Sequence, residues 1–269
     1  MLNKVLSKQN RALLAELVRT DFKLRYQGSA IGYTWSLLKP LLIFSILYVV
    51  FTRFIPLGKG IEHYPVVLLL GLVLWTFFTE MTTQSLGSIV ARGDLIRKIR
   101  IPRWIIVLSS SVSAIINLSL NLLIVAVFMI LNGVDLQKTI VLFPLILIEI
   151  YILALGVSLW LAAAFVKFRD VNSLWEVFVQ GAFYATPIIY PLTLIINPLY
   201  QKIILLNPMA QAMQDARYAL ITHDPAIITM SRAYQSGFYM LIPIGISLLI
   251  LVTGILYFKS QAKSFAENL

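Results

Sequence analysis

Two charged residues lie inside long apolar runs of the sequence, where a charge is unusual and often has a chemical role. Lys39 follows Trp35 in one run, and Glu149 lies near the middle of another. Lys39 could bind an anionic ligand at the end of its run. Glu149 could be a functional carboxylate, or it could be neutral and hydrogen-bonded to Asn117 or Asn121, which lie one helical turn apart. We expect the structural role for Glu149.

Other catalytic and metal-binding patterns are missing from the sequence. It has no Cys, so a thiolate metal site is excluded, and its two His residues are far apart. The carboxylates are isolated, which argues against a membrane enzyme such as a glycosyltransferase. No Gly-rich loop ending in Gly-Lys-Ser or Gly-Lys-Thr occurs, so ATP would not bind here in that way. We therefore expect a non-enzymatic chain without a metal or cofactor of its own.

The composition is that of a polytopic membrane protein. Of 269 residues, 59% are hydrophobic and 13% are charged, and the mean hydropathy is +0.85. Several apolar stretches have the ~20 residues that a helix needs to cross a bilayer. The sequence predicts an all-α integral membrane protein with six spans at about 35–55, 64–83, 104–131, 140–166, 173–194 and 238–258. No internal repeat is visible, and an internal repeat would favour a secondary transporter.

The basic residues predict the orientation of the chain. Alternating sides from the N-terminus, fifteen of the 22 Lys and Arg residues fall on one side and six on the other. The positive-inside rule therefore predicts that both termini lie in the cytoplasm. The net charge of +10 is mainly this topology signal, so no nucleic-acid partner is expected. The predicted domains are a cytoplasmic segment 1–34, a transmembrane domain 35–258 and a cytoplasmic tail 259–269.

Two cytoplasmic segments combine apolar and basic residues. Residues 7–26 predict an amphipathic helix on the membrane surface, although Asp21 and Arg25 interrupt its apolar side. In loop 84–103, Asp94 is expected to be the N-cap of a short helix that ends before Pro102. This loop also contains Leu95, Ile96, Arg97 and Lys98. Aliphatic and basic side chains together are typical of a docking surface for another protein.

Segment 187–236 is apolar but is interrupted by proline. Its prolines are Pro187, Pro191, Pro198, Pro208 and Pro225. The uninterrupted pieces are too short to cross a bilayer, and irregular backbone at membrane depth must be sheltered by protein or water. We expect short extracytoplasmic re-entrant helices between the fifth and sixth spans.

Four motifs in this order resemble a known family. They are "FKLRYQGSAIGYTWSLLKPLL", the basic loop ending in "IPR", "FRDV" at 168–171 and "LLNPMAQAMQDAR" at 206–217. Together they are similar to the membrane permease of bacterial ATP-binding-cassette exporters for polysaccharides and polyol phosphates. That family includes exporters of O-antigen, teichoic acid and capsule. The resemblance covers nearly the whole chain.

The resemblance implies a half-transporter. Two copies would form a channel for a lipid-linked glycan, surrounded by membrane lipids, and two copies of a separate ATPase would bind ATP and Mg²⁺ below it. Residues 7–26 and about 86–101, including Asp94, Leu95, Ile96, Arg97 and Lys98, would contact the ATPase, as would Arg169 and Asp170 in the "FRDV" turn. Residues 187–225 would form the extracytoplasmic gate, with Asn207, Pro208 and Arg217 at matching positions. The family often has an aromatic residue where this chain has Ile101.

Aromatic side chains suggest a route for a glycan. Phe44, Tyr48 and Phe51 share one face of the first span, and Trp175 and Phe178 begin the fifth. Aromatic rings pack against the C–H faces of sugars, but they also pack between spans or against lipid. Lys39 likewise has two interpretations, as an anchor that reaches the headgroups or as a cation at the inner mouth of the channel. The alternative function is an ATP-driven exporter of drugs or small lipids.

Overall fold

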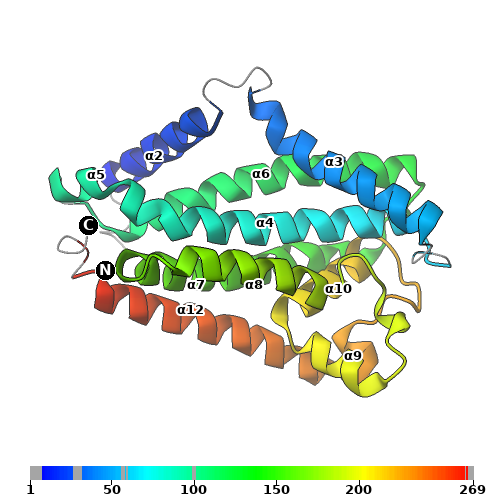
Figure 1. Cartoon of the computed structure of the whole chain (residues 1–269). Helices are drawn as coiled ribbons and strands as arrows, with labels where there is room; N and C mark the ends of the chain where they lie inside the picture. The colour runs from blue at the N-terminus through cyan, green and yellow to red at the C-terminus, as the bar shows by residue number, and fades with distance from the viewer. Residues whose placement is uncertain are drawn as a thin grey trace.

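The computed structural model describes residues 8–26, 32–55, 58, 60–98, 101–263 and 265. Within these residues the chain is helical and has no strands. The helices are α2 (Lys8–Tyr26), α3 (Trp35–Val49), α4 (Tyr64–Ala91), α5 (Gly93–Lys98), α6 (Trp104–Leu131), α7 (Phe143–Lys167), α8 (Val171–Ala185), α9 (Pro198–Leu205), α10 (Pro208–Leu220), α11 (Met230–Tyr234) and α12 (Leu241–Gln261). Figure 1 shows the long helices side by side, with α5 at one end of the bundle and α9 and α10 at the other. We call these the α5 end and the α10 end.

Five helical segments in the described part of the chain are long and apolar enough to cross a membrane. They are Trp35–Phe54, Tyr64–Ala91, Trp104–Leu131, Lys138–Lys167 and Gly237–Gln261. These segments overlap five of the six predicted spans. The chain is therefore an all-helical protein with five candidate membrane-spanning helices.

The fifth expected span, 173–194, differs in the structure. Helix α8 has 15 residues and ends at Ala185, and Thr186 is extended with ψ of 136°. The cause is Pro187, because the residue before a proline is driven out of the helical region. A helix of this length measures about 22 Å, which is less than the ~30 Å of a hydrocarbon layer. An irregular segment follows α8 instead of a continuous span.

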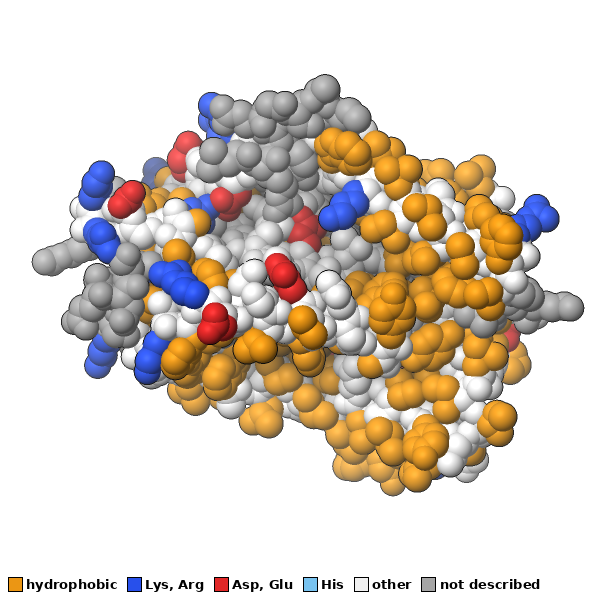
Figure 2. Space-filling model, viewed as in Figure 1, with side chains coloured by type: hydrophobic (Ala, Val, Ile, Leu, Met, Phe, Trp, Pro, Cys, Tyr) orange, Lys and Arg blue, Asp and Glu red, His pale blue; other side chains and the backbone are white. Residues whose placement is uncertain are grey.

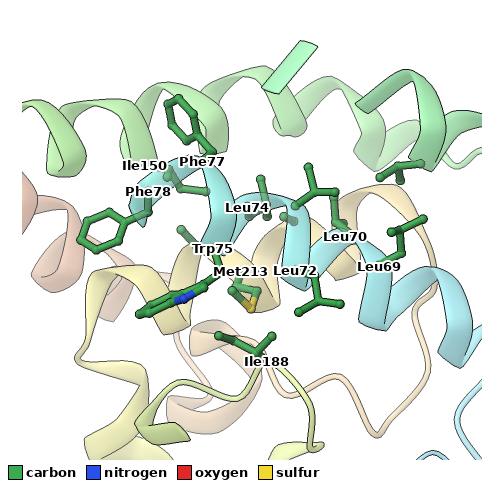
Figure 3. Packing of buried hydrophobic residues seen from close by; sticks show 14 of the residues in the cluster. Leu69, Leu70, Leu72, Leu74, Trp75, Phe77, Phe78, Ile150, Ile188 and Met213 are labelled. Carbon is green, nitrogen blue, oxygen red and sulfur yellow. The ribbon is translucent and has the colours of Figure 1, made fainter. Parts of the chain in front are cut away.

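Helix α4 is the centre of the bundle. Its most apolar window is 78% buried, against 33% or less for the other four candidate spans. The consecutive residues Leu68, Leu69 and Leu70 are all almost fully buried, so neighbours surround the helix on every side. Figure 3 shows these neighbours, with Met213 of α10, Ile188 and Ile150 of α7 packed around the side chains of α4.

Helices α7 and α12 meet at a pair of glycines. A Cβ atom at Gly254 would lie 2.5 Å from the carbonyl oxygen of Gly156, and one at Gly156 would lie 2.6 Å from the backbone nitrogen of Leu251. Both helices begin near the α10 end and run towards the α5 end (Figure 1). Small residues let the two backbones touch, as in many helix pairs within membranes.

A second apolar cluster closes the α5 end. It joins Leu17 of α2 to Ile89 of α4, Ile106 of α6, Val166 of α7 and Phe258 of α12. Figure 2 shows that Lys, Arg, Asp and Glu gather at this end of the viewed face, whereas the rest is largely hydrophobic. The charged end is the one that the sequence places in the cytoplasm.

The glycine crossing yields a prediction about stability. We expect Gly254→Ala to lower the free energy of unfolding by about 1–3 kcal/mol, because the new methyl group would push the two backbones apart. Gly245 lies on the same helix, and a Cβ there would meet no atom within 4 Å. Gly245→Ala should therefore leave stability unchanged or raise it slightly. Thermal unfolding of the purified variants, followed by tryptophan fluorescence, checks this. Equal unfolding temperatures for the two variants would contradict the crossing.

Candidate functional site

A cavity of about 710 Å³ lies between α3, α4, α6 and α8. We call it the α3–α4 cavity. Its lining residues are Trp35, Ser36, Lys39, Pro40, Ile43, Leu72, Trp75, Thr76, Thr79, Glu80, Thr83, Gln84, Asn117 and Phe183. Hydroxyl, amide and charged groups share this wall with aromatic and aliphatic ones. Such a mixture is suited to a ligand that has both polar and apolar surfaces.

Opposite charges face the α3–α4 cavity. Lys39 is exposed and brings a positive charge from α3, while Glu80 brings a half-buried carboxylate from α4. The Glu80 oxygen Oε1 accepts hydrogen bonds from Nε2 of Gln84, at 2.7 Å, and from Nδ2 of Asn117. Sequence reasoning placed Lys39 in a site but did not select Glu80. The spacing of Glu80 and Gln84, one helical turn apart, was the available signal.

Pro40 shapes the wall that α3 contributes. Proline has no N–H, so the Ser36 carbonyl lacks the helical donor that residue 40 would normally supply. The amide Nδ2 of Asn121 in α6 donates to this carbonyl at 3.4 Å and also donates to the Asn117 carbonyl at 2.8 Å. The Asn121 side chain on the neighbouring helix therefore supplies a hydrogen bond that Pro40 cannot donate.

The predicted aromatic face of the first span is only partly buried in the bundle, since Tyr48 is 37% exposed. Phe44 is only 4% exposed and packs edge-on against Phe128, with ring centroids 5.3 Å apart. Tyr48 stacks on Phe44 at 5.7 Å, and Phe51 packs at the margin of the same core. None of the three lines the α3–α4 cavity. The reason is packing: α3 turns this face towards α6.

A different set of aromatic rings lines the cavity. Trp75 and Phe183 both belong to its wall, and their ring centroids are 6.0 Å apart. From Trp75 the ring contacts continue to Phe78 at 5.7 Å and from Phe78 to Trp175 at 6.3 Å. Trp175 in turn stacks on Phe178 at 5.1 Å. The structure thus connects the predicted residues Trp175 and Phe178 to the cavity through α4.

Helix α2 is attached to the α5 end by an ion pair as well as by Leu17. The Arg92 guanidinium bonds the Asp21 carboxylate, and its Nη1 donates to the Ser109 hydroxyl at 3.0 Å. Asp21, which interrupts the apolar side of α2 in the sequence, is therefore the residue that fixes α2 to the bundle. The side chains of Leu24 and Arg25 lie outside the described residues.

Helix α5 presents two different faces. It begins at Gly93, so Asp94 lies in its first turn, and the expectation that Asp94 is the N-cap is wrong. Leu95 and Ile96 are half-buried against the cluster at the α5 end. Asp94, Arg97 and Lys98 are exposed. The charged face, rather than the aliphatic one, is available to another protein.

The turn after α7 lies at the same end of the bundle. Arg169 and Asp170 are exposed, and Asp170 immediately precedes α8. The Arg169 guanidinium lies 5.2 Å from the ring centroid of Phe165, which orients it along α7. The exposed faces of α5 and of this turn thus occupy one end of the molecule.

The α10 end is built from two helices that begin with the dipeptide Asn-Pro. Asn197 accepts a hydrogen bond from the N–H of Leu199 at 2.9 Å, and Asn207 accepts one from Met209 at 3.0 Å. In both helices proline occupies the first position, where its missing N–H has no cost. The expected short helices therefore occur at Pro198–Leu205 and Pro208–Leu220.

Arg217 connects α10 to the irregular segment after α8 and to α4. It is 2% exposed. Its guanidinium donates to the carbonyls of Pro187 and Ile188, each at 2.7 Å, to the Val67 carbonyl at 3.3 Å and to Oε1 of Gln214 at 2.8 Å. Burial lowers the pKa of Arg217 to about 10, so the side chain remains protonated at neutral pH.

A glycine makes room for this guanidinium. A Cβ atom at Gly71 would lie 2.5 Å from Nη2 of Arg217. The carbonyls of Pro187 and Ile188 belong to non-helical chain, where no regular backbone donor is available. Arg217 supplies that donor, so these buried carbonyls are paired.

Glu149 does not pair with Asn117 or Asn121, so that expectation is wrong. It lies instead in a second cavity with Gln211 and Asp215 of α10. Sequence spacing could not reveal this, because α10 lies about 60 residues further along the chain. Burial raises the pKa of Asp215 to about 6, against the opposing effect of its hydrogen bond from Gln211. Among the described residues, no group of three or more His, Asp or Glu side chains could hold a metal ion.

The network around Arg217 yields a prediction. Lysine has one ammonium group and cannot reach all of these acceptors, so Arg217→Lys leaves buried carbonyls without donors. We expect it to destabilise the protein by about 2 kcal/mol or more. Arg232 also donates to three backbone carbonyls but is exposed, so water can replace its bonds. Arg232→Lys should cost less than about 1 kcal/mol. Comparable shifts in unfolding temperature for the two variants would refute the role of Arg217.

Comparison with known proteins gives one consistent result. The family model of the ABC-2 type transporter matches residues 12–221. The chain is 29% identical over 262 residues to an O-antigen export system permease protein RfbA from Myxococcus xanthus, covering 97% of this chain and 96% of that protein. It is 30% identical over 258 residues to a protein of the same name from Klebsiella pneumoniae, covering 96% and 95%. The chain belongs to the ABC-2 type transporter family of membrane proteins.

Proposed function

We propose that the chain is the channel-forming permease subunit of an ATP-driven exporter for a lipid-linked polysaccharide or polyol phosphate. The observation that carries the substrate class is the near full-length similarity to two permeases named for O-antigen export. The chain itself performs no chemical step. ATP and Mg²⁺ bind to a separate ATPase subunit.

The α3–α4 cavity supports a path for an anionic glycolipid. Lys39 attracts a pyrophosphate head, and a low-dielectric surrounding strengthens that attraction. Trp35, Trp75 and Phe183 offer ring faces to sugars, while the hydroxyl groups of α4 serve the sugar hydroxyls. The path proposed from the sequence used Lys39, Phe44, Tyr48, Phe51, Trp175 and Phe178. Within that set, the contacts favour Lys39, Trp175 and Phe178.

The path is completed by a second copy of the chain. Helix α8 has no buried residue, and its side chains Leu174, Val177, Phe178 and Tyr184 are exposed. The apolar window of Trp35–Phe54 is also only 11% buried. Both helices border the α3–α4 cavity, so a partner copy placed against them would enclose it. A helix too short to cross a bilayer is also best accommodated against protein.

Two copies of an ATPase bind the α5 end. The surface consists of α2, the exposed face of α5 and the turn with Arg169 and Asp170. The Asp21–Arg92 ion pair connects α2 with the end of α4, so force applied to α2 or α5 reaches the spans. The α10 end is the extracytoplasmic gate, with Asn207 and Pro208 starting its longer helix and Arg217 holding that helix to α4.

The orientation follows from charge. The excess of Lys and Arg at the α5 end supports a cytoplasmic location for it, with segment 1–34 and tail 259–269 on the same side. The protein is thus a multi-pass protein of the bacterial cytoplasmic membrane. Helix α2 lies along the membrane surface, and six segments including α8 cross or enter the bilayer.

The alternative is an ATP-driven exporter of drugs or small lipids on the same scaffold. The experiment uses inverted membrane vesicles that contain the chain and its ATPase subunit. We expect ATP-dependent uptake of a pyrophosphate-linked glycan and no uptake of cationic dyes. Dye uptake without glycan uptake would support the alternative and refute the proposal.

The same vesicles test Lys39. We expect Lys39→Gln to lower glycan uptake about tenfold, the effect of losing one charge-assisted contact with the pyrophosphate. Lys39→Arg keeps the charge and should be mild. An anchoring lysine would tolerate both changes with a small loss. Export is measured at matched protein levels, and near-normal uptake with Lys39→Gln would remove Lys39 from the path.

The faces of α5 predict how the ATPase is held. We expect the double variant Arg97→Glu and Lys98→Glu to weaken co-purification of the ATPase about tenfold, because charge reversal at a rim opposes docking. The unfolding temperature should not change, since both side chains are exposed. A matched reversal at Lys202 and Arg53, away from the α5 end, should leave binding intact. Unchanged ATPase recovery with the α5 variant would place the docking surface elsewhere.

A further inference from the structure

The second cavity, of about 390 Å³, lies between α7, α10 and α12. Glu149 of α7, Gln211 and Asp215 of α10 and Ser247 of α12 form one polar wall, and Tyr218, Thr229 and Ser231 also line the cavity. We call it the Glu149 cavity. It does not include any residue of the α3–α4 cavity, so it is separate from the proposed glycan path.

The glycine crossing explains why a cavity forms there. Glu149 precedes Gly156 by seven residues, and Ser247 precedes Gly254 by seven. Seven residues are two helical turns, so each polar residue lies on the same face as its glycine and about 10 Å closer to the α10 end. The backbones touch at the glycines and diverge from there. Helix α10 enters the gap with Gln211 and Asp215.

Three polar atoms of this wall lack a hydrogen-bond partner. Within the described residues, Oε1 of Glu149, Oε1 of Gln211 and Oγ of Ser247 are buried and have no hydrogen-bond partner. The three residues are 8%, 0% and 1% exposed. One N–H of the Gln211 amide donates to Oδ2 of Asp215. Buried acceptors that remain unpaired are costly, so this set is suited to a ligand rich in N–H donors.

The acidic residues of the polar wall favour a positively charged ligand. Glu149 and Asp215 are both acidic, and the described lining contains no Lys or Arg. Arg217 cannot neutralise them, because it lies two residues from Asp215, on the other side of α10, and donates to Pro187 and Ile188. Two carboxylates close together in an apolar surrounding favour a bound positive charge.

The remaining lining residues and the size of the cavity argue against a bare metal ion as the ligand. It is mostly aliphatic, and the cavity has more than ten times the ~30 Å³ that one water occupies. Leu145, Ile148 and Leu248 line it and are 62%, 53% and 46% exposed on the outer faces of α7 and α12. Both helices are candidate spans, so the mouth faces the membrane. A ligand with an ammonium group attached to an apolar body would contact both the acidic wall and the aliphatic lining of the cavity.

We propose that the Glu149 cavity binds the headgroup of a membrane phospholipid that carries a primary ammonium group, with the acyl chains leaving between α7 and α12. The ammonium donates to Glu149, Gln211 and Asp215, while Ser247 completes the contact. The lipid phosphate remains at the rim, where Arg232 lies 4.7 Å from the ring centroid of Tyr218, a lining residue. The lipid thereby holds α10 against α7 and α12.

Native mass spectrometry tests this with the full chain, purified together with its ATPase and stripped of lipid. The complex is incubated with equal amounts of phosphatidylethanolamine, its N-trimethylated analogue phosphatidylcholine, and phosphatidylglycerol, all with the same acyl chains. We expect about tenfold greater retention of the ethanolamine lipid, because trimethylation removes every N–H donor. Equal retention of the three lipids would overturn the proposal.

Variants separate the cavity from general lipid binding. Glu149→Gln combined with Ser247→Ala should abolish the preference for the ethanolamine lipid. Glu176→Gln, an equivalent change on the exposed surface of α8, should retain it. If the double variant fails to fold, Leu248→Trp fills the mouth while keeping every polar group, and it should also lower retention. An unchanged preference in the folded variants, or a Na⁺ or Mg²⁺ adduct that replaces the lipid, would refute the headgroup site.

Discussion

The buried guanidinium of Arg217 is the interaction on which much of the α10 end depends. Chain without regular hydrogen bonds cannot remain inside an apolar surrounding unless a side chain supplies the missing donors. Arg217 supplies them to Pro187 and Ile188, and it can approach α4 because Gly71 has no side chain. Helix α8 can therefore end early and α10 can lie against α4. This contact therefore joins the irregular segment and α10 to α4.

The two cavities follow from how the helices are held apart. Helix α3 is attached mainly at its far half, where Phe44 packs on Phe128. At its start, the amide of Asn121 donates to the Ser36 carbonyl that Pro40 leaves without its helical donor. Space remains between its first turns, α4 and α8. Helices α7 and α12 instead touch at one pair of glycines and diverge towards α10. One cavity carries Lys39 and Glu80 beside aromatic rings, and the other carries two carboxylates beside aliphatic chains. Their chemistry suits different ligands, a glycan with an anionic head and a phospholipid whose headgroup carries an ammonium group.

At the α5 end, several residues whose role is not evident from the sequence make contacts between helices. Asp21 seems misplaced on the apolar side of its helix until Arg92 and Ser109 surround it. Leu95 and Ile96 pack against the apolar cluster that joins α2, α4, α6, α7 and α12. The charged residues of α5 remain exposed. The surface that we propose for ATPase docking thus consists of charged side chains over an apolar base.

The sequence by itself determined the class of the protein and most of its helices. In a bilayer, a long apolar run can pair its backbone N–H and C=O groups by forming a helix. The predicted spans 104–131 and 35–55 correspond closely to the helical segments Trp104–Leu131 and Trp35–Phe54. Asn-Pro at 197–198 and 207–208 starts the two short helices by local capping chemistry, and the ordered motifs indicated the transporter family. Pro187 also encoded the early end of α8, although apolar composition alone suggested a longer span. Only the tertiary structure decided which side chains meet. Glu149 meets Gln211 and Asp215 rather than an asparagine, Phe44 faces the core, and Glu80 joins Lys39 at one cavity. These contacts join residues far apart along the chain, and their geometry depends on helix rotation and crossing angle, which apolar periodicity leaves undetermined when helices are hydrophobic on every side.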